Sequence, residues 1–181
     1  GMMYGMGVNK LSEQLDVSLD EARELIGQYH ARVPFVKKLM NGVTQRLNEK
    51  SSSGSIRSIR GRKCRFDLWE PDTFSMNKAL PYKEALKEYG ETTKLKRAYS
   101  YKALNRLIQA SAADMTKQSM VNLYKEGIIP LIQIHDEIAV SVKDKNTAKD
   151  IAKIMENAVL LEVPNKCDVE IGPSWGEAKA L

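Results

Sequence analysis

The chain has 181 residues, of which 43% are hydrophobic and 28% are charged, and its formal net charge is +5. These values are typical of a soluble globular protein with one sizeable domain or two small ones, and the basic charge suggests a polyanionic partner without requiring one. The sequence contains no apolar run long enough to cross a bilayer and no signal peptide, and its two cysteines provide neither a disulfide framework nor a metal-ligand cluster. We therefore expect an intracellular protein.

The first fifty residues are predicted to be helical. One short helix is expected over residues 8–15, and Ser18 followed by Glu21 has the capping-box pattern that predicts the start of a second. A third helix is predicted from Pro34 to about residue 47. Its predicted buried stripe consists of Phe35, Leu39, Val43 and Leu47.

A strongly basic segment follows the loop Ser-Ser-Ser-Gly at residues 51–54. Residues 55–66 are predicted to form a hairpin that turns at Gly61. Within nine positions this segment carries five cations and no acid: Arg57, Arg60, Arg62, Lys63 and Arg65. Like charges that face one another destabilise a sheet, and phosphates would relieve their repulsion. We therefore interpret the hairpin as a nucleic-acid contact rather than as a solvated charged face.

The next stretch has little pattern, and one helix is predicted in it over residues 82–89. From Lys94 to about Lys125, one long helix or two abutting helices are predicted. Side chains four residues apart lie close together on a helix, which groups Tyr101, Asn105 and Gln109. Asn and Gln both donate and accept hydrogen bonds, and the DNA minor groove offers acceptors that every base pair shares. This stripe could contact a duplex without reading its sequence, although a polar face in water is the better explanation if the stripe is taken alone.

Two short apolar arms flank the triplet His135-Asp136-Glu137 within residues 131–142. Their β-branched residues at period two predict half-buried strands, which a tight turn at His135 and Asp136 would join as a hairpin. Carboxylates beside buried strands are costly unless something positive lies against them, and a divalent cation with oxygen ligands would meet that need. Taken alone, the triplet is better explained as a plain surface turn, where Asp is common.

The remainder of the chain is predicted to contain one helix and one strand. An amphipathic helix is expected from Thr147 to Leu161, and the alternation over residues 167–171 suggests a third strand. Residues 172–176 are predicted to be turn-like, with Trp175 as an aromatic anchor.

Taken together, several segments in order resemble the family A DNA polymerases, the DNA polymerase I family, and their phage branch more than the bacterial enzyme. Residues 134–137, Ile-His-Asp-Glu, match the third catalytic motif of that family, and residues 104–114 resemble the palm helix that contacts the primer-template minor groove. Tyr4-Gly5 resembles the end of the fingers helix. The basic turn at residues 61–63 and the closing segment 172–175 also fit, so the likeness spans essentially the whole chain.

The resemblance implies an α+β fold, in which a small antiparallel palm sheet packs on long helices. Residues 1–50 would form the C-terminal part of the helical fingers subdomain. Residues 51–181 would form the palm portion, with the basic hairpin, the long helix, the hairpin around residue 136, and the C-terminal helix and strand. The chain would then be the C-terminal part of a DNA-directed DNA polymerase.

The resemblance also implies roles for individual residues. Asp136 would be a metal-binding catalytic carboxylate and Glu137 a supporting acid in a two-metal Mg²⁺ site. The implied DNA contacts are His135, Gln109, Asn105, Tyr101, Arg62 and Lys63, and Tyr101 stands where bacterial enzymes carry an arginine. The implied nucleotide contacts are Tyr4 and Gly5.

The other essential aspartate of the family is expected upstream of this chain, together with the residues that hold the triphosphate. We therefore expect no polymerase activity from the chain alone. Its expected partners are primer-template DNA, deoxynucleoside triphosphates and the missing N-terminal polymerase portion, in the cytoplasm of a bacterial or phage-infected cell, with no membrane. An unpaired sheet edge could also allow self-association.

Three other functions are weighed against this one. A non-catalytic nucleic-acid-binding module would use the same basic hairpin and polar stripe. A metal-dependent nuclease is disfavoured, because one acidic doublet supplies too few ligands. The RNA-polymerase branch of the same superfamily is a closer alternative, which Tyr4 and His135 do not exclude.

Overall fold

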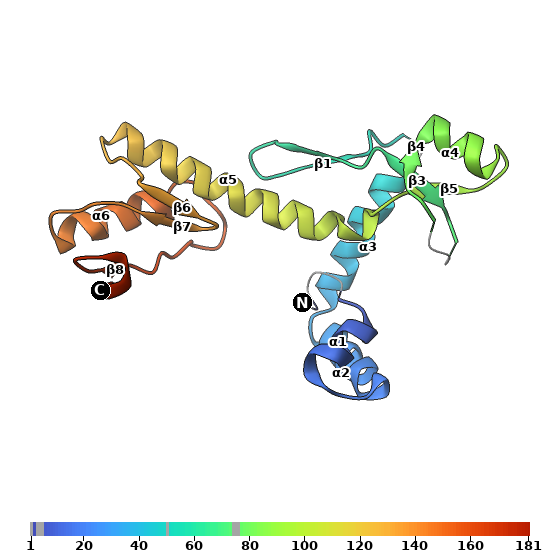
Figure 1. Cartoon of the computed structure of the whole chain (residues 1–181), viewed down its shortest axis with the longest axis horizontal. Coiled ribbons are helices and arrows are strands. Elements are labelled where there is room, and N and C mark those ends of the chain that lie inside the picture. The colour runs from blue at the N-terminus through green and yellow to red at the C-terminus, as the bar shows by residue number, and fades with distance from the viewer. Residues whose placement is uncertain (1, 3–5, 50, 74–76) are drawn as a thin grey trace. The chain divides into compact units, whose positions relative to one another are not determined.

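The computed structural model describes residues 2, 6–49, 51–73 and 77–181. The chain divides into two compact units, Gly1–Ile108 and Gln109–Leu181, and helix α5 (Ala103–Lys125) runs from one into the other (Figure 1). Helices together with four small antiparallel sheets in the described residues make this an α+β fold, as predicted. None of the described helices is long and apolar enough to cross a membrane.

Three helices open the first unit: α1 (Val8–Leu15), α2 (Leu19–Arg32) and α3 (Pro34–Asn48). The predicted capping box is present at the start of α2. The Ser18 hydroxyl accepts a hydrogen bond from the Glu21 backbone N–H at 3.2 Å, and the Glu21 carboxylate accepts one from the Ser18 backbone N–H at 2.9 Å. Local signals therefore determine where α2 begins.

The buried face of α3 differs from the predicted one. Val36 and Leu47 are buried, whereas Phe35 is 63% exposed and Leu39 is 46% exposed. Successive residues turn by about 100° around a helix, so each step of four shifts a side chain by about 40° from the one before. The predicted row therefore winds across the surface, and only its end, at Val43 and Leu47, packs in the core.

The basic segment forms the predicted hairpin from β1 (Ser55–Arg57) and β2 (Lys63–Arg65), with Arg57 opposite Lys63. Gly61 lies in its turn at a φ of +82°, a conformation that glycine adopts without steric cost. Behind the hairpin, Leu47, Phe66 and Ala103 form a buried cluster. This cluster joins α3, the end of the hairpin and the start of α5.

A second sheet of the first unit was not predicted. Strand β3 (Leu68–Pro71) pairs antiparallel with both β4 (Leu80–Pro81) and β5 (Leu95–Arg97), and α4 (Tyr82–Tyr89) is the predicted helix between them. Strand β5 corrects the prediction of a helix from Lys94 onward. Helix α5 begins only at Ala103, after a single 3-10 turn over Ser100–Lys102.

In the second unit, α5 ends at the predicted glycine. The backbone N–H groups of Gly127 and Ile128 donate to the carbonyls of Tyr124 and Leu123 at 3.1 and 2.9 Å, which is the Schellman pattern. After it come β6 (Ile132–Ile134) and β7 (Glu137–Ala139), which form the predicted hairpin.

The C-terminal elements are shorter than predicted. Helix α6 (Lys145–Glu156) begins directly after its N-cap, Asp144, and ends five residues before Leu161. The predicted strand over residues 167–171 is reduced to β8 (Glu170–Ile171), which pairs with β9 (Lys179–Ala180) rather than with the β6–β7 hairpin. A 3-10 turn over Trp175–Glu177 lies between β8 and β9.

Candidate metal site and nucleic-acid interface

The tip of the β6–β7 hairpin carries the predicted catalytic acids. Ile134 lies opposite Glu137 in the strand register, so His135 and Asp136 form the two-residue connection. His135 has a φ of +52°, which residues other than glycine seldom adopt, and its carbonyl accepts a hydrogen bond from Gln133 Nε2 at 2.5 Å. Asp136 therefore lies at the apex of a β-turn, as the sequence predicts.

The hairpin is more exposed than predicted. Ile132 and Ile134 are 45% and 43% exposed, so β6 is not half-buried, and Asp136 and Glu137 are exposed as well. Within the described residues neither carboxylate forms an ion pair. The acids are thus not neutralised by a lysine or arginine that the structure describes.

The donor set at this tip fits magnesium. Asp136 and Glu137 are adjacent and offer carboxylate oxygens, the ligands that Mg²⁺ prefers, and Mg²⁺ retains water and substrate oxygens when one or two carboxylates hold it. The described residues contain no cluster of three or more His, Cys, Asp or Glu that could enclose a metal ion. Ligands in addition to these two acids would have to come from elsewhere.

The predicted polar stripe begins before the α-helix. Asn105 is half-buried and Gln109 is exposed on α5, whereas Tyr101 belongs to the preceding 3-10 turn and is 61% exposed. The Lys102 ammonium lies 5.5 Å from the Tyr101 ring centroid and 5.2 Å from that of Tyr99. An exposed pair of tyrosines with a cation between them thus precedes α5.

The basic hairpin has two chemically different faces. Side chains alternate across a strand, and the register places Arg57, Lys63 and Arg65 together on one face, all exposed. Ile56 and Cys64 lie on the other face and pack against the core cluster. The hairpin therefore presents a row of cations to solvent because its apolar side is held by the fold.

The turn of this hairpin is hydrogen-bonded internally. The backbone N–H of Arg62 donates to the Ser58 hydroxyl at 3.1 Å, and Arg57 Nη1 donates to the Gly61 carbonyl at 2.9 Å. From the first turn of α5, the Arg106 guanidinium lies 4.9 Å from the Phe66 ring centroid. Arg106 thus adds one more exposed cation beside the hairpin, and it was not among the predicted contacts.

Arg97 is the principal residue that the sequence did not single out. Its Nε, Nη1 and Nη2 donate to the carbonyls of Leu47, Phe66 and Ser52 at 3.0, 2.8 and 3.3 Å. Its guanidinium also lies 4.5 Å from the ring centroid of Trp69. One side chain therefore connects the end of α3, the loop before β1, the end of β2 and strand β3.

Gly54 makes room for this guanidinium. A Cβ atom at position 54 would lie 2.3 Å from Arg97 Cζ, and the φ of Gly54 is +65°. The Ser-Ser-Ser-Gly loop offered a partial sequence signal for this contact, but nothing local points to Arg97 as its partner. The close approach is visible only in the structure.

The predicted site residues are distributed over the two units. The first unit contains the basic hairpin, Tyr101 and Asn105, and the second contains Gln109 and the acids of the β6–β7 turn. Tyr4 and Gly5 lie outside the described residues.

The sequence matches the profile of DNA polymerase family A over residues 1–177. It is 36% identical over 158 residues to a DNA-directed DNA polymerase of Pseudomonas phage M6, which covers 87% of this chain and 20% of that protein. It is 30% identical over 188 residues to DNA polymerase I of Geobacillus stearothermophilus, which covers 99% of this chain and 19% of that protein. The chain thus spans about a fifth of the length of these curated relatives.

The fold is similar to a solved polymerase domain as well. The match is to the POL domain of Pol1 from M. smegmatis, in complex with DNA primer-template and dNTP, with a TM-score of 0.65 and 26% sequence identity. It covers 91% of this chain and 27% of the other.

Proposed function

The chain belongs to DNA polymerase family A, and we propose that it supplies part of the active site of a DNA-directed DNA polymerase. The observation that carries this proposal is the β6–β7 turn, which presents Asp136 and Glu137 to solvent in a chain that matches the family over 177 residues. The M. smegmatis structure that it resembles holds primer-template and dNTP, which supports DNA and nucleotides as its partners. In this proposal residues 1–50 belong to the fingers and residues 51–181 to the palm.

Asp136 would hold magnesium, with Glu137 as a supporting acid near the primer terminus. The exposure of Asp136 at a turn suits this role, because a carboxylate there can reach a metal ion together with a substrate oxygen. When bound, magnesium would supply the charge that activates the primer 3′ oxygen and neutralises the departing pyrophosphate. The contribution of this chain is to fix one carboxylate ligand at the apex of a short hairpin.

The remaining predicted contacts would position the nucleic acid. The cations of the basic hairpin, Lys63 on its outward face and Arg62 in its turn among them, would bind backbone phosphates. Asn105 and Gln109 would donate hydrogen bonds to minor-groove acceptors near the newly formed base pair. His135 would touch the primer strand, and Tyr101 would contact the DNA. Tyr4 and Gly5 would contact the incoming nucleotide.

We expect the isolated chain not to extend a primer. The two-metal reaction needs a further carboxylate, which we propose comes from an upstream segment of a longer polymerase. The purified chain is incubated with primer-template, magnesium and nucleotides, and products are resolved on a denaturing gel. Extension by this chain, without other protein, would contradict the proposal.

The catalytic assignment is tested in a polypeptide that joins this chain to its upstream polymerase segment. Asp136→Ala is expected to lower synthesis by about 10³-fold or more, as expected when a residue of a catalytic unit is removed. Duplex affinity should stay the same or rise slightly, because a negative charge near the DNA is lost. Unchanged synthesis would favour the second candidate, a non-catalytic nucleic-acid-binding module built on the basic hairpin.

A further inference from the structure

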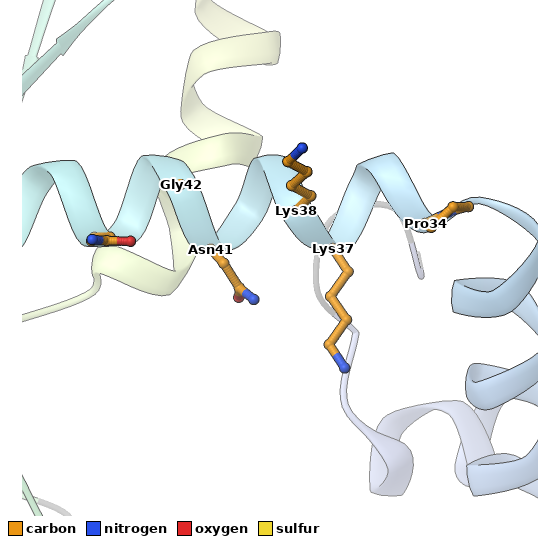
Figure 2. Close-up of a pocket in the computed structure, with 6 residues that line it drawn as sticks. Pro34, Lys37, Lys38, Asn41 and Gly42 are labelled. Atoms are coloured by element: carbon orange, nitrogen blue, oxygen red, sulfur yellow. The ribbon is translucent and has the colours of Figure 1, made fainter.

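The solvent face of α3 carries an open hollow that no predicted role uses. Lys37, Lys38, Asn41 and Gln45 line it around Gly42, together with Pro34, and its volume is about 580 Å³ (Figure 2). The core of the unit lies on the other side of the helix, where Val36 and Leu47 are buried. The lining side chains are therefore free to serve a ligand without loss of packing.

The sequence around this face is basic and contains few acids. Residues 32–65 contain ten Lys and Arg and a single acid, Glu49. Within the described part of the chain, Lys37 and Lys38 form no ion pair. Two lysines that no carboxylate balances favour a polyanion as the ligand.

An exposed aromatic ring adjoins the cations. Phe35 lies three positions before Lys38, a spacing that makes the two side chains neighbours on the surface of α3, and 63% of the Phe35 surface is exposed. Proteins that bind unpaired strands combine a cationic groove for the backbone with aromatic side chains on which bases stack. A base within a duplex is already stacked on its neighbours, so an exposed phenyl ring favours an unpaired strand over a paired one.

The length of the site agrees with one short strand. Lys37 and Gln45 are eight residues apart, which corresponds to about 12 Å along a helix axis. Asn41 lies between them and can donate a hydrogen bond, as can Gln45. Figure 2 shows Lys37 and Asn41 extending to the same side of α3 and Lys38 to another. At about 100° per residue, Asn41 and Gln45 lie between the two lysines around the helix, so Lys37 and Lys38 flank this face and a backbone that crosses it could meet both ammonium groups.

We propose that the α3 surface, defined by Phe35, Lys37, Lys38, Asn41 and Gln45, binds a single-stranded nucleic acid. Lys37 and Lys38 contact its phosphates, and a base stacks on Phe35. The site goes beyond the contacts proposed for primer-template, which lie on the basic hairpin, on Tyr101 and α5, and on the β6–β7 turn. The α3 surface can therefore be tested independently of the primer-template contacts.

The test measures binding of the full chain to a fluorescent unpaired oligothymidylate and to a blunt duplex, by anisotropy over a range of salt. The double variant Lys37→Ala/Lys38→Ala should bind the unpaired strand about tenfold more weakly. It should also lower the slope of log affinity against log salt by about 1.4, since each phosphate contact on a single strand contributes about 0.7. Binding to the blunt duplex should change less than about twofold.

A matched control removes two lysines from α4. Lys83 and Lys87 are also exposed on a helix, but Glu84 and Glu88 alternate with them. The Lys83→Ala/Lys87→Ala variant has the same net charge as the α3 variant and should bind the unpaired strand as the unmodified chain does. Equal losses in the two double variants would show a non-specific charge effect and overturn the proposal.

Phe35→Ala separates stacking from charge. It should weaken binding of the unpaired strand about tenfold while the salt slope stays unchanged, because base-aromatic stacking releases no counterions. The proposal is overturned if the unmodified chain fails to bind the unpaired strand, or if the α3 variants weaken both DNAs equally. Arg62→Ala/Lys63→Ala should weaken duplex binding, and failure of that variant alone would count against the proposed function and not against the α3 surface.

Discussion

Arg97 acts through backbone carbonyls that belong to three separate segments. Replacing it with methionine keeps an unbranched chain but leaves the carbonyls of Leu47, Phe66 and Ser52 without this donor. We expect Arg97→Met to lower the free energy of unfolding by about 2–4 kcal/mol, since partly buried acceptors lose charge-assisted hydrogen bonds. The midpoint of urea denaturation measures the change.

Arg97→Lys and Lys94→Met serve as controls for this prediction. A lysine keeps the charge but lacks the planar fork that reaches separate acceptors, so Arg97→Lys should recover only a minor part of the loss. Lys94 directly precedes the same strand and pairs with Asp72 at the surface, so its loss should be small. A Lys94→Met variant as unstable as Arg97→Met would contradict the proposed role of Arg97.

Gly54 and Arg97 should be energetically coupled. An alanine at position 54 would be strained by the positive φ, and its Cβ would overlap with the Arg97 guanidinium. Gly54→Ala is therefore expected to destabilise the chain by about 1–3 kcal/mol. In the Arg97→Met background the overlap is reduced, and the effect of Gly54→Ala should be smaller by at least about 0.5 kcal/mol. A double-mutant cycle in urea measures this coupling, and strictly additive losses would rule it out.

Two glycines inside helices are positions where a substitution should raise stability. Gly27 in α2 and Gly42 in α3 have open space where a Cβ would be placed. Since glycine is a poor helix former in a helix interior, Gly27→Ala and Gly42→Ala should each raise the free energy of unfolding by about 0.5–1 kcal/mol. Thermal unfolding followed by circular dichroism measures both. A fall in stability would show that one of these positions is packed against something.

The start of α6 should depend on pH. Hydrogen bonds from the backbone N–H groups of Thr147 and Asn146 lower the pKa of Asp144, its N-cap. A carboxyl whose pKa is lowered by folding stabilises the fold above its unfolded pKa, and this contribution is lost as pH falls through the folded value. Asp144→Asn keeps a capping oxygen and should remove this acid dependence, whereas Asp144→Ala should destabilise α6 at all pH values. Unfolding curves between pH 2 and pH 7 would separate the two variants.

The helices were predicted well because their signals are local. The capping box of α2 and the Schellman glycine of α5 lie within a few residues of the ends that they define. Strands β3 and β5 were missed because their pairing joins residues more than twenty positions apart, with no periodic pattern to mark them. The same is true of Arg97, whose three acceptors lie 31 to 50 residues away in the sequence.

The turn at Asp136 was predicted correctly because it depends on adjacent residues, but the burial of its strands was not. Apolar alternation indicates which side chains could be buried together, and it does not supply the partner that buries them. In the described residues β6 pairs only with β7, so Ile132 and Ile134 remain exposed. Asp136 therefore lies in the turn as predicted, but the strands on either side of it are more exposed than predicted.

For the molecule as a whole, charge is divided between the two units. Residues 1–108 contain 20 Lys and Arg against 12 Asp and Glu, whereas residues 109–181 contain 8 against 11. The net charge of +5 therefore understates how basic the first unit is. Under the proposed function, the cations of the first unit would bind phosphates, and the acids of the second unit would bind a metal ion.

The chain is expected to self-associate through the edge of β6. Strand β6 has one edge without a partner among the described residues. Its apolar residues Ile132 and Ile134 are 45% and 43% exposed, and Leu131, just before it, is 64% exposed. An exposed apolar strand edge can pair with another chain, and a lysine placed on it prevents this. We expect the purified chain to dimerise or aggregate as its concentration rises, and Ile132→Lys to keep it monomeric in sedimentation velocity runs. Phe35→Lys, which removes an exposed apolar side chain from a helix, should leave the association unchanged. Equal suppression by the two variants would attribute the association to general hydrophobicity and not to the β6 edge.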